Sequence, residues 1–393
     1  MSSAKLFSMS QAPEVTLAQQ LVRISSPSCK EFEVMAFMVE TFKSLGFDEA
    51  YLDEAGNALG VFRRGDGPTV MLNGHLDTVP TGDESLWPQP PLSGEIVNGE
   101  LWGRGSVDMK SAVAAMACAA KDAVAAGFQG TLIVSAVVQE EIGGLGARHL
   151  GGTGADVVIL GEPSNLNLML GHRGRVEVEV TLPGKIAHAA KAENGDNALY
   201  HAADLLQKVR GLELPAGGPL GASTITPTNL ESYPRESRNV VPGGARLILD
   251  YRNIPGDEPG DILAKLRHLA PEARFEVRER TAVSENGDVS LSFADVPPYL
   301  CPGENQLVSI ARESVKASLK PYSLDLTERV WWFATDAPHL AEGGAPVIGF
   351  GPGDENLAHT TNERVLVKHI EISRAVYRDL ALAYSQKPAK ERA

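Results

Sequence analysis

Apolar residues recur with two different spacings in the first part of the chain. Helical spacing predicts helices over 17–24 and 34–45, and an alanine-rich helix over about 109–126 that ends at Gly127. Extended apolar runs occupy 58–62, 69–72, 131–138 and 157–160. Apolar strands separated by a long helix predict a largely parallel, buried sheet. In such sheets, functional sites collect at the carboxyl ends of the strands.

From about Arg175 the pattern changes to alternating apolar and charged residues, with valines on one face and glutamates on the other. One face of this strand is therefore expected to be solvated. The segments that follow are predicted as a helix over 197–209, strands over 223–230 and 245–254, a helix over 260–269 and a strand over 274–281. This β-α-β-β-α-β order is that of a ferredoxin-like unit.

The α/β pattern resumes near Pro298, with a helix predicted over 305–319 and a strand over 347–350. We therefore expect an α/β fold with a mostly parallel sheet and helices on both faces, carrying an inserted ferredoxin-like α+β domain. The expected limits are 1–173 for the first part of the main domain, 174–284 for the insert and 285–393 for the second part. The last residues, 387–393, are expected to form a loose tail.

Charge and composition exclude several classes of partner. The chain has 393 residues and a formal net charge of -14, so nucleic acid and anionic membrane surfaces are not expected partners. Its longest apolar run, 112–120, is far shorter than the roughly 20 residues of a membrane span. Residues 1–11 show no secretory signal. The three cysteines are far apart and odd in number, which favours a reducing compartment and predicts a cytoplasmic protein.

Candidate metal ligands follow the predicted strands. The strand at 69–72 runs into His75 and Asp77, two residues apart on one side of an extended segment. A carboxylate beside an imidazole commonly orients a metal-binding histidine. Each residue alone also has an ordinary explanation, such as a strand-end His or a turn Asp. Asp108, just before the alanine-rich helix, could equally be its N-cap.

The later strands end in the same kind of residue. Glu140 and Glu141 follow the strand at 131–138 and should point to opposite sides, so different roles are expected for them. Glu162 follows the strand at 157–160, and His359 lies beyond the strand at 347–350. Nitrogen and oxygen donors converging on one sheet edge, without a thiolate, suit zinc, with cobalt or manganese as alternatives. The nearby Gly144-Leu145-Gly146 lacks the third glycine of a dinucleotide-binding loop, which argues against a nicotinamide enzyme.

The sequence resembles the dinuclear-zinc amidohydrolases and exopeptidases that include acetylornithine deacetylase, succinyl-diaminopimelate desuccinylase, aminoacylase and glutamate carboxypeptidase. The resemblance runs over nearly the whole chain, from the helices before Pro27 to Glu363. The motifs that carry it, in order, are Gly74-His75-Leu76-Asp77-Thr78-Val79-Pro80, Gly103-Arg104-Gly105 with Asp108-Met109-Lys110, Glu140-Glu141, Gly161-Glu162-Pro163, Gly184-Lys185 with Ala187-His188-Ala189, and Ala358-His359 with Asn362-Glu363.

The resemblance implies two divalent metal ions per chain, with zinc first and cobalt or manganese as alternatives. Asp108 would bridge them, and the Asp108–Met109 peptide bond would be cis. Asp77 would orient His75, and Glu140 would act as general base and later as general acid. The implied ligands are His75, Asp108 and Glu162 in one site, and Asp108, Glu141 and His359 in the other.

The inserted domain would act as a lid and a dimerisation domain. In the implied homodimer, His188 would reach the neighbouring subunit's active site, and Arg252 and Asn239 would hold the carboxylate and carbonyl of the substrate. Ala189 stands where the family usually has serine, and Lys191 where proline is common. These two differences leave the local geometry of the lid open.

The resulting hypothesis is a metal-dependent hydrolase of an amide bond next to a free carboxylate, acting on an N-acyl amino acid. A dipeptidase or carboxypeptidase on the same site is the main alternative, and a non-catalytic binding protein is a more distant one. The sequence does not reveal the acyl group. The run Trp331-Trp332-Phe333 fits either a buried strand or the wall of an apolar acyl pocket.

Overall fold

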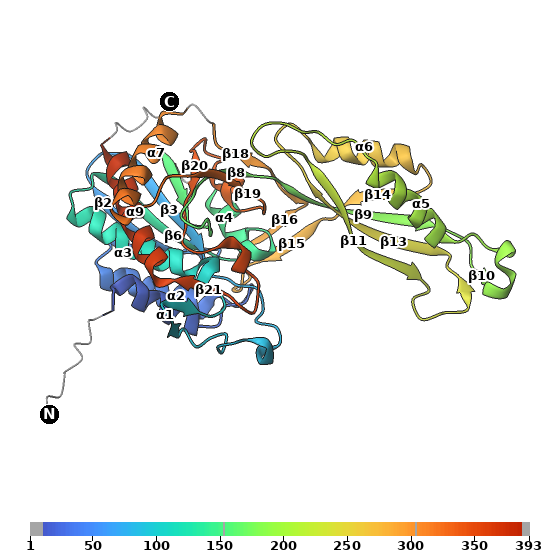
Figure 1. Ribbon diagram of the computed structural model, residues 1–393, viewed down its shortest axis with the longest axis horizontal. Helices are drawn as coiled ribbons and strands as arrows, with labels where there is room; N and C mark the ends of the chain where they lie inside the picture. Colours follow the sequence, from blue (N-terminus) through green and yellow to red (C-terminus); the bar gives the residue numbers. More distant parts are fainter. Residues whose placement is uncertain (1–10, 152–153, 303–304, 387–393) are drawn as a thin grey trace.

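The computed structural model describes residues 11–151, 154–302 and 305–386, which form two lobes of unequal size (Figure 1). The larger lobe contains both ends of the described chain and a nine-stranded sheet. The smaller lobe extends away from it and contains a five-stranded sheet with two helices.

The sheet of the larger lobe has the strand order β1-β2-β6-β3-β7-β20-β8-β18, with β19 also paired to β8. Its central neighbours β6, β3, β7 and β20 are parallel, and the flanking pairs β1–β2, β2–β6, β20–β8 and β8–β18 are antiparallel. The predicted α/β fold with a largely parallel sheet is confirmed. The strands are β1 (Glu49–Leu52), β2 (Ala58–Arg64), β3 (Thr69–His75), β6 (Gly130–Val137), β7 (Val157–Leu160), β8 (Leu168–His172), β18 (Tyr299–Leu300), β19 (Glu328–Trp331) and β20 (Val347–Gly349).

Helices cover both faces of this sheet because alternate residues of its strands are apolar on both sides. In β3, Val70 and Leu72 belong to one buried cluster and Met71 to another. The first cluster includes residues of α1 (Pro13–Arg23), α2 (Phe32–Leu45), α3 (Ser111–Ala125), α7 (Gln306–Leu319) and α9 (Val367–Ser385). The second includes residues of α4 (Leu145–Leu150) and α8 (Ala337–Leu340).

The smaller lobe has the sheet order β11-β13-β9-β14, which is the order of a ferredoxin-like unit. Valines of β9 face a buried cluster with α5 and α6, and its glutamates lie on the other face. Its elements are β9 (Arg175–Pro183), α5 (Ala198–Arg210), β11 (Thr224–Tyr233), β13 (Gly244–Arg252), α6 (Pro259–Leu269), β14 (Arg274–Val277) and β17 (Asp295–Val296), which pairs with β9. The limits drawn at 173/174 and 284/285 stay a prediction.

One strand predicted for this lobe is in fact two. The segment predicted over 274–281 leaves the sheet after Val277 and continues as β15 (Arg280–Val283), which pairs with β16 (Ser290–Phe293). The break arises because Ala282 is buried in the core of the larger lobe. Burial in the larger lobe thus overrides the single strand that the sequence predicts over 274–281. The hairpin of β15 and β16 lies where the two lobes meet (Figure 1).

The remaining elements are short. They are β4 (Ile96–Val97), β5 (Glu100–Trp102) and β21 (Arg364–Leu366) in one small sheet, β10 (Ala187–His188) and β12 (Val240–Val241) in another, a π-type turn over Ser106–Lys110 and 3-10 turns over Glu84–Leu86, Glu140–Ile142, Ala189–Asn194, Lys320–Tyr322 and Glu355–Leu357. Among the described residues, no helix is both long and apolar enough to cross a membrane. Two predictions fall outside the described residues. They are the loose tail over 387–393 and, for residues 1–10, the absence of a secretory signal.

Candidate metal centre and active site

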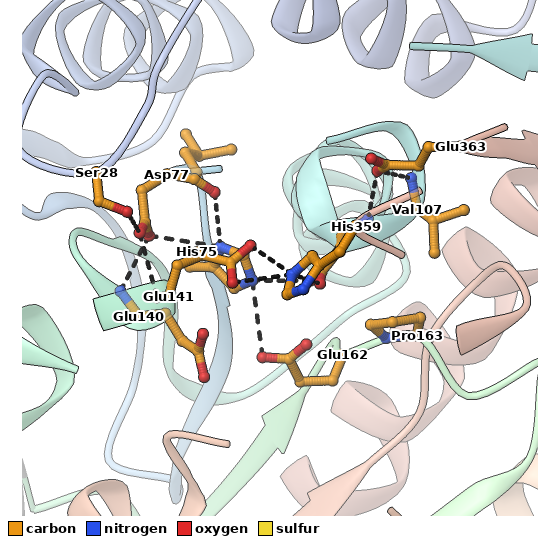
Figure 2. Close-up of polar contacts among 12 residues, drawn as sticks. Ser28, His75, Asp77, Val107, Glu140, Glu141, Glu162, Pro163, His359 and Glu363 are labelled. Atoms are coloured by element: carbon orange, nitrogen blue, oxygen red, sulfur yellow. Dashed lines mark hydrogen bonds and ion pairs between the residues drawn. The ribbon is translucent and has the colours of Figure 1, made fainter. Parts of the chain in front are cut away.

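The carboxyl ends of three adjacent parallel strands bring the predicted ligands to one edge of the sheet. His75 is the last residue of β3, the turn with Glu140 and Glu141 follows β6, and Glu162 stands two residues after β7. His359 enters from the loop beyond β20, and Figure 2 shows it facing the same centre. The side chains predicted from the strand ends therefore lie together.

The first potential ligand group consists of His75, Asp108 and Glu162, all of which are buried. Nε2 of His75 lies 2.9 Å from Oδ1 of Asp108 and 3.8 Å from Oε1 of Glu162. Burial alone would lower the pKa of His75, but hydrogen bonds to Asp108 and Asp77 raise it well above its usual range. Burial, and then the neighbouring Asp108, raise the pKa of Glu162.

The second potential group shares Asp108 and adds Glu141 and His359. Nε2 of His359 lies 2.9 Å from Oε2 of Glu141 and 3.2 Å from Oδ2 of Asp108. Hydrogen bonds to these two carboxylates raise the pKa of His359 to about 10. Burial would raise the pKa of Asp108, but its bonds with His359 and His75 lower it. The carboxylate of Asp108 thus belongs to both groups.

The segment that carries Asp108 is not the helix start that was one alternative. The helix α3 begins only at Ser111, and no side chain caps it. Asp108 precedes it in the π-type turn, and the Asp108–Met109 peptide is cis, as the resemblance implied. The N-cap explanation is therefore wrong, because the Asp108 carboxylate faces the two histidines instead of the helix amides.

Buried charges hold this segment on both sides of Asp108. Oε1 of Glu363 accepts hydrogen bonds from the backbone N–H groups of Val107 and Asp108, at 3.1 and 3.3 Å. Arg104 donates a further hydrogen bond to the same carboxylate. On the other side, Nζ of Lys110 donates to the carbonyls of Leu21 and Ile24 at the end of α1.

Asp77 is fully buried and holds both His75 and the turn with the two glutamates. Its backbone carbonyl lies 2.9 Å from Nδ1 of His75, and its Oδ1 lies 3.5 Å from the same nitrogen. The carboxylate also accepts the backbone N–H groups of Glu140 and Glu141, at 3.0 and 3.2 Å. This arrangement fixes which nitrogen of His75 faces the potential ligands.

Glu140 lines a cavity of about 350 Å³ that also contains Asp108, Glu141, Glu162 and His359. Burial raises the pKa of Glu140 well above its usual range, and the charges of Glu162 and Asp336 add to the shift. Asp336 also lines the cavity and is itself 2% exposed. A carboxyl group in such surroundings is suited to accept and return a proton.

The donor set fits divalent cations. Three carboxylates bring three negative charges to a largely buried site, and a cation is the usual compensation for such a cluster. Oε1 of Glu162 is buried without a hydrogen-bond partner among the described residues. This oxygen therefore has a free lone pair directed into the site, as a metal ligand would.

The residues predicted in the smaller lobe fall into two groups. Arg252, at the end of β13, lines the cavity and pairs with Asp250 at 2.5 Å. His188 and Asn239 are exposed and do not line it. They lie side by side, since the N–H of Ala189 donates to the carbonyl of Asn239, and β10 with His188 occupies the far end of the smaller lobe (Figure 1). Of these three predicted residues, Arg252 alone lines the cavity of its own chain.

The aromatic run at the end of β19 divides between the two alternatives. Trp331 ends β19 and is 2% exposed, and its indole N–H donates to the carbonyl of Pro163. Trp332 is 56% exposed and, with Phe333, lines the cavity. Trp331 is thus a buried strand residue, whereas Trp332 and Phe333 form part of the cavity wall. That this wall receives an acyl group stays a prediction.

Two residues of the site received no role from the sequence, although both stand in or beside quoted motifs. Glu363 is fully buried and follows His359 by four positions, which was the available signal. Asp336 precedes the short helix α8 and follows the aromatic run by three positions. Neither contact could be inferred, because their partners are far away in sequence.

Comparison with known proteins agrees with this geometry. Residues 71–383 match Peptidase family M20/M25/M40. The uncharacterized protein YgeY of Escherichia coli (strain K12) is 29% identical over 391 residues, covering 95% of each chain. Succinyl-diaminopimelate desuccinylase of Cereibacter sphaeroides (strain ATCC 17025 / ATH 2.4.3) is 29% identical over 389 residues, covering 94% of this chain and 98% of that protein.

A solved structure shares the fold. The M20 family metallo-carboxypeptidase Sso-CP2 from Sulfolobus solfataricus superposes with a TM-score of 0.76 at 18% identity, covering 96% of this chain and 100% of that one. The resemblance seen in the sequence motifs is thereby confirmed. The chain belongs to peptidase family M20/M25/M40 and is a metal-dependent hydrolase of amide bonds.

Proposed function

We propose that the chain deacylates N-acyl amino acids, cleaving an amide bond next to a free carboxylate. The observation that carries this proposal is a single cavity that holds both potential ligand groups, Glu140 and the guanidinium of Arg252. Asp250 accepts hydrogen bonds from Nε and one terminal nitrogen of Arg252 and so holds the guanidinium in place. The remaining N–H groups of Arg252 can donate to a substrate carboxylate. The desuccinylase relative, which covers nearly the whole chain, supports an acyl group as the part removed.

Two divalent cations are proposed for the site, zinc first, with cobalt or manganese as alternatives. His75, Asp108 and Glu162 would hold one, and Asp108, Glu141 and His359 the other. When bound, such ions lower the pKa of water towards about 7 and polarise a carbonyl group. The chain itself supplies the orientation, through Asp77 behind His75 and Glu363 behind Asp108.

Glu140 is proposed as the group that moves the proton. It would take a proton from the attacking water and return it to the leaving nitrogen, a role typically worth about 10²–10⁴-fold in rate. Its carboxylate lines the cavity, and its backbone is held by Asp77. That position lets the side chain reach the reacting atoms without serving as a ligand.

His188 and Asn239 are proposed to act in the site of a second copy of the chain. Both are exposed at the far end of the smaller lobe, away from the cavity of their own chain. In a homodimer joined through this lobe, His188 would stabilise the developing oxyanion, and Asn239 would hold the substrate carbonyl. The cytoplasmic location predicted from the cysteines remains a prediction.

An activity screen tests the proposal. Metal-loaded protein would be assayed on N-acetyl, N-succinyl and N-formyl amino acids and on dipeptides, each with a free carboxylate. Amino acid release from the N-acyl series, and none from amides that lack the carboxylate, is the expected result. Faster cleavage of dipeptides would instead identify a peptidase on the same site.

Metal analysis is the second part of the test. Elemental analysis should find two divalent ions per chain, and dialysis against a chelator should abolish activity until zinc, cobalt or manganese is returned. Full activity in metal-free protein would rule out the proposed centre.

A further inference from the structure

The active-site cavity has one wall that takes no part in holding metal or carboxylate. Its apolar residues come from two separate segments, one running from the end of β16 into β17 and the other directly following β19, and Asp295 is the charged residue within the first. Its members are Phe293, Ala294, Val296, Trp332, Phe333 and Ala334. Substrate pockets commonly combine such an apolar wall with a few placed polar groups.

Trp332 is the most exposed large side chain of this wall, at 56%. Trp331 ends β19 in the core, and Trp332, in the bend that follows, lines the cavity. Its ring is held edge-on against Phe333, with ring centroids 5.1 Å apart and an interplanar angle of 79°. An aromatic ring that is fixed by its neighbours yet open to solvent at a cavity offers a surface for an apolar ligand group.

Phe293 belongs to the first segment of the wall and lies beside the turn that carries Glu140 and Glu141. A Cβ atom on Gly143 would come within 2.1 Å of the Phe293 ring, so this position requires glycine for close approach, and its φ of +132° agrees. The guanidinium of Arg148 covers the Phe293 ring at 4.4 Å from its centroid. The Phe293 ring is therefore fixed against Gly143, which follows Glu140 by three positions.

The other part of the wall is joined to the loop that carries Glu162. The indole N–H of Trp331 donates to the carbonyl of Pro163 at 2.8 Å, and Pro163 follows the potential ligand Glu162. The aromatic segment is thus attached to the ligand-bearing loop. Both aromatic segments line the same cavity as Glu140.

We propose that Trp332, Phe333 and Phe293 form a subsite for a bulky apolar group of the substrate. This inference rests on the proposed function and deepens it: the preferred substrates carry an aromatic or branched aliphatic group next to the scissile amide. The group can belong to the amino acid or to the acyl part, and the same aromatic wall would recognise either.

A small substrate series separates these two sources. N-acetyl-alanine has no bulky group, N-acetyl-phenylalanine carries one on the amino acid, and N-benzoyl-alanine carries one on the acyl part. At least one bulky substrate should exceed N-acetyl-alanine in kcat/KM by about 10-fold or more, a usual range for apolar pocket contacts. In Trp332→Ala, that advantage, measured as the ratio of kcat/KM values to N-acetyl-alanine, should fall to about 2-fold.

Phe32→Ala is the matched control. Phe32 is an aromatic residue that is 64% exposed and does not line the cavity, so its removal should leave the substrate preference unchanged. An equal loss on all three substrates in Trp332→Ala, or no loss on any, would overturn the subsite. A preference for N-acetyl-aspartate over both bulky substrates would overturn it too, in favour of a polar pocket.

A binding arm keeps the inference separable from the proposed function. In a Glu140→Gln background, calorimetry would compare dissociation constants for N-acetyl-phenylalanine, N-benzoyl-alanine and N-acetyl-alanine, with and without Trp332→Ala. A bulky compound should bind about 5-fold tighter or more, and Trp332→Ala should remove the difference. This result would support the subsite even if no substrate were turned over, whereas equal binding of all three compounds would overturn it.

Discussion

Asp77 illustrates how much of the site depends on single buried side chains. Its backbone carbonyl faces Nδ1 of His75, and its two carboxylate oxygens accept the N–H groups of Glu140 and Glu141. The hydroxyl of Ser28 donates to the same carboxylate at 2.7 Å. One residue therefore sets the orientation of a potential ligand, of a second ligand's backbone and of the proposed base.

We expect Glu140→Gln to keep the metal content while kcat falls by two or more orders of magnitude. The amide retains the size of the side chain but cannot take up a proton. Steady-state kinetics and elemental analysis on the same sample would check this. Glu141→Gln is the matched control, because it changes the adjacent residue and should instead weaken metal binding. Metal loss in Glu140→Gln would mean that the two roles are exchanged.

Glu363→Gln should weaken the binding of metal by roughly 10- to 100-fold, as is typical when a residue that supports a metal ligand is changed. Its carboxylate accepts the N–H of Asp108, and burial raises its pKa to about 7 in spite of Arg104. Titration of the metal-free protein with cobalt would measure the affinity. Glu371→Gln, which alters a surface carboxylate paired with Lys368, should have no effect. A lower melting temperature with unchanged affinity would assign Glu363 a purely structural role.

At the scale of single elements, β8 ends in a buried histidine that makes folding depend on pH. Burial lowers the pKa of His172 from 6.5 to about 4. Between these values the unfolded chain binds a proton that the folded chain does not. The stabilising contribution is therefore complete above pH 6.5 and is lost as the pH falls to about 4, by about 3 kcal/mol in all.

His172→Gln should remove this dependence. Between pH 7 and pH 4, the free energy of unfolding should fall by about 3 kcal/mol less in the variant than in the unchanged protein. Urea unfolding at several pH values, in chelator so that metal does not contribute, would measure the difference. His268→Gln is the control, since that side chain lies on an exposed position of α6. Parallel curves for His172→Gln and the unchanged protein would contradict the prediction.

The strand ends could be predicted because a buried strand is a run of apolar residues, and the polar residues that follow mark where it ends. His75, Glu141 and Glu162 were placed correctly at the sheet edge for that reason. The start of α3 was predicted too early, because the alanine-rich pattern continues through a turn that is not helical. Local periodicity carries no information about such a turn.

Contacts between distant segments were beyond the sequence pattern. Glu363 reaches the backbone of Asp108 across 255 positions, and the strand predicted over 274–281 breaks because Ala282 is buried in the other lobe. Apolar content identified Trp331, Trp332 and Phe333 as a unit, but only the packing shows which of them is buried. These features depend on tertiary contacts and not on spacing.

At the scale of the whole molecule, the smaller lobe has an edge strand, β11, whose outer edge pairs with no other described strand. β11 pairs only with β13 among the described strands, and it exposes Leu230 at 42% and Tyr233 at 38%. On α5 of the same lobe, Tyr200 is 72% exposed. Open edges and exposed aromatic residues are typical of surfaces that another chain covers.

Mixing two inactive variants tests the proposed dimer. A His188→Ala chain combined with a Glu140→Gln chain should regain up to about a quarter of the unmutated activity, because half of a random mixture is mixed dimer. In each mixed dimer, one site takes its base and its lid histidine from unmutated residues. Each variant alone is the control. If mixed dimers are confirmed by mass and no activity returns, His188 does not act across the interface.

The pairing of β8 with β18 influences the order in which the chain folds. His172 and Tyr299 are neighbours in the main sheet, although about 125 residues lie between them, and closing so long a loop costs about 4 kcal/mol in chain entropy. If the smaller lobe forms first, the pairing of β9 with β17 already holds its two ends together. We expect pulse-labelled hydrogen exchange to protect β9, β11 and β13 before β8 and β18. The insertion would then speed the assembly of the sheet that it interrupts, and protection in the reverse order would show that it does not.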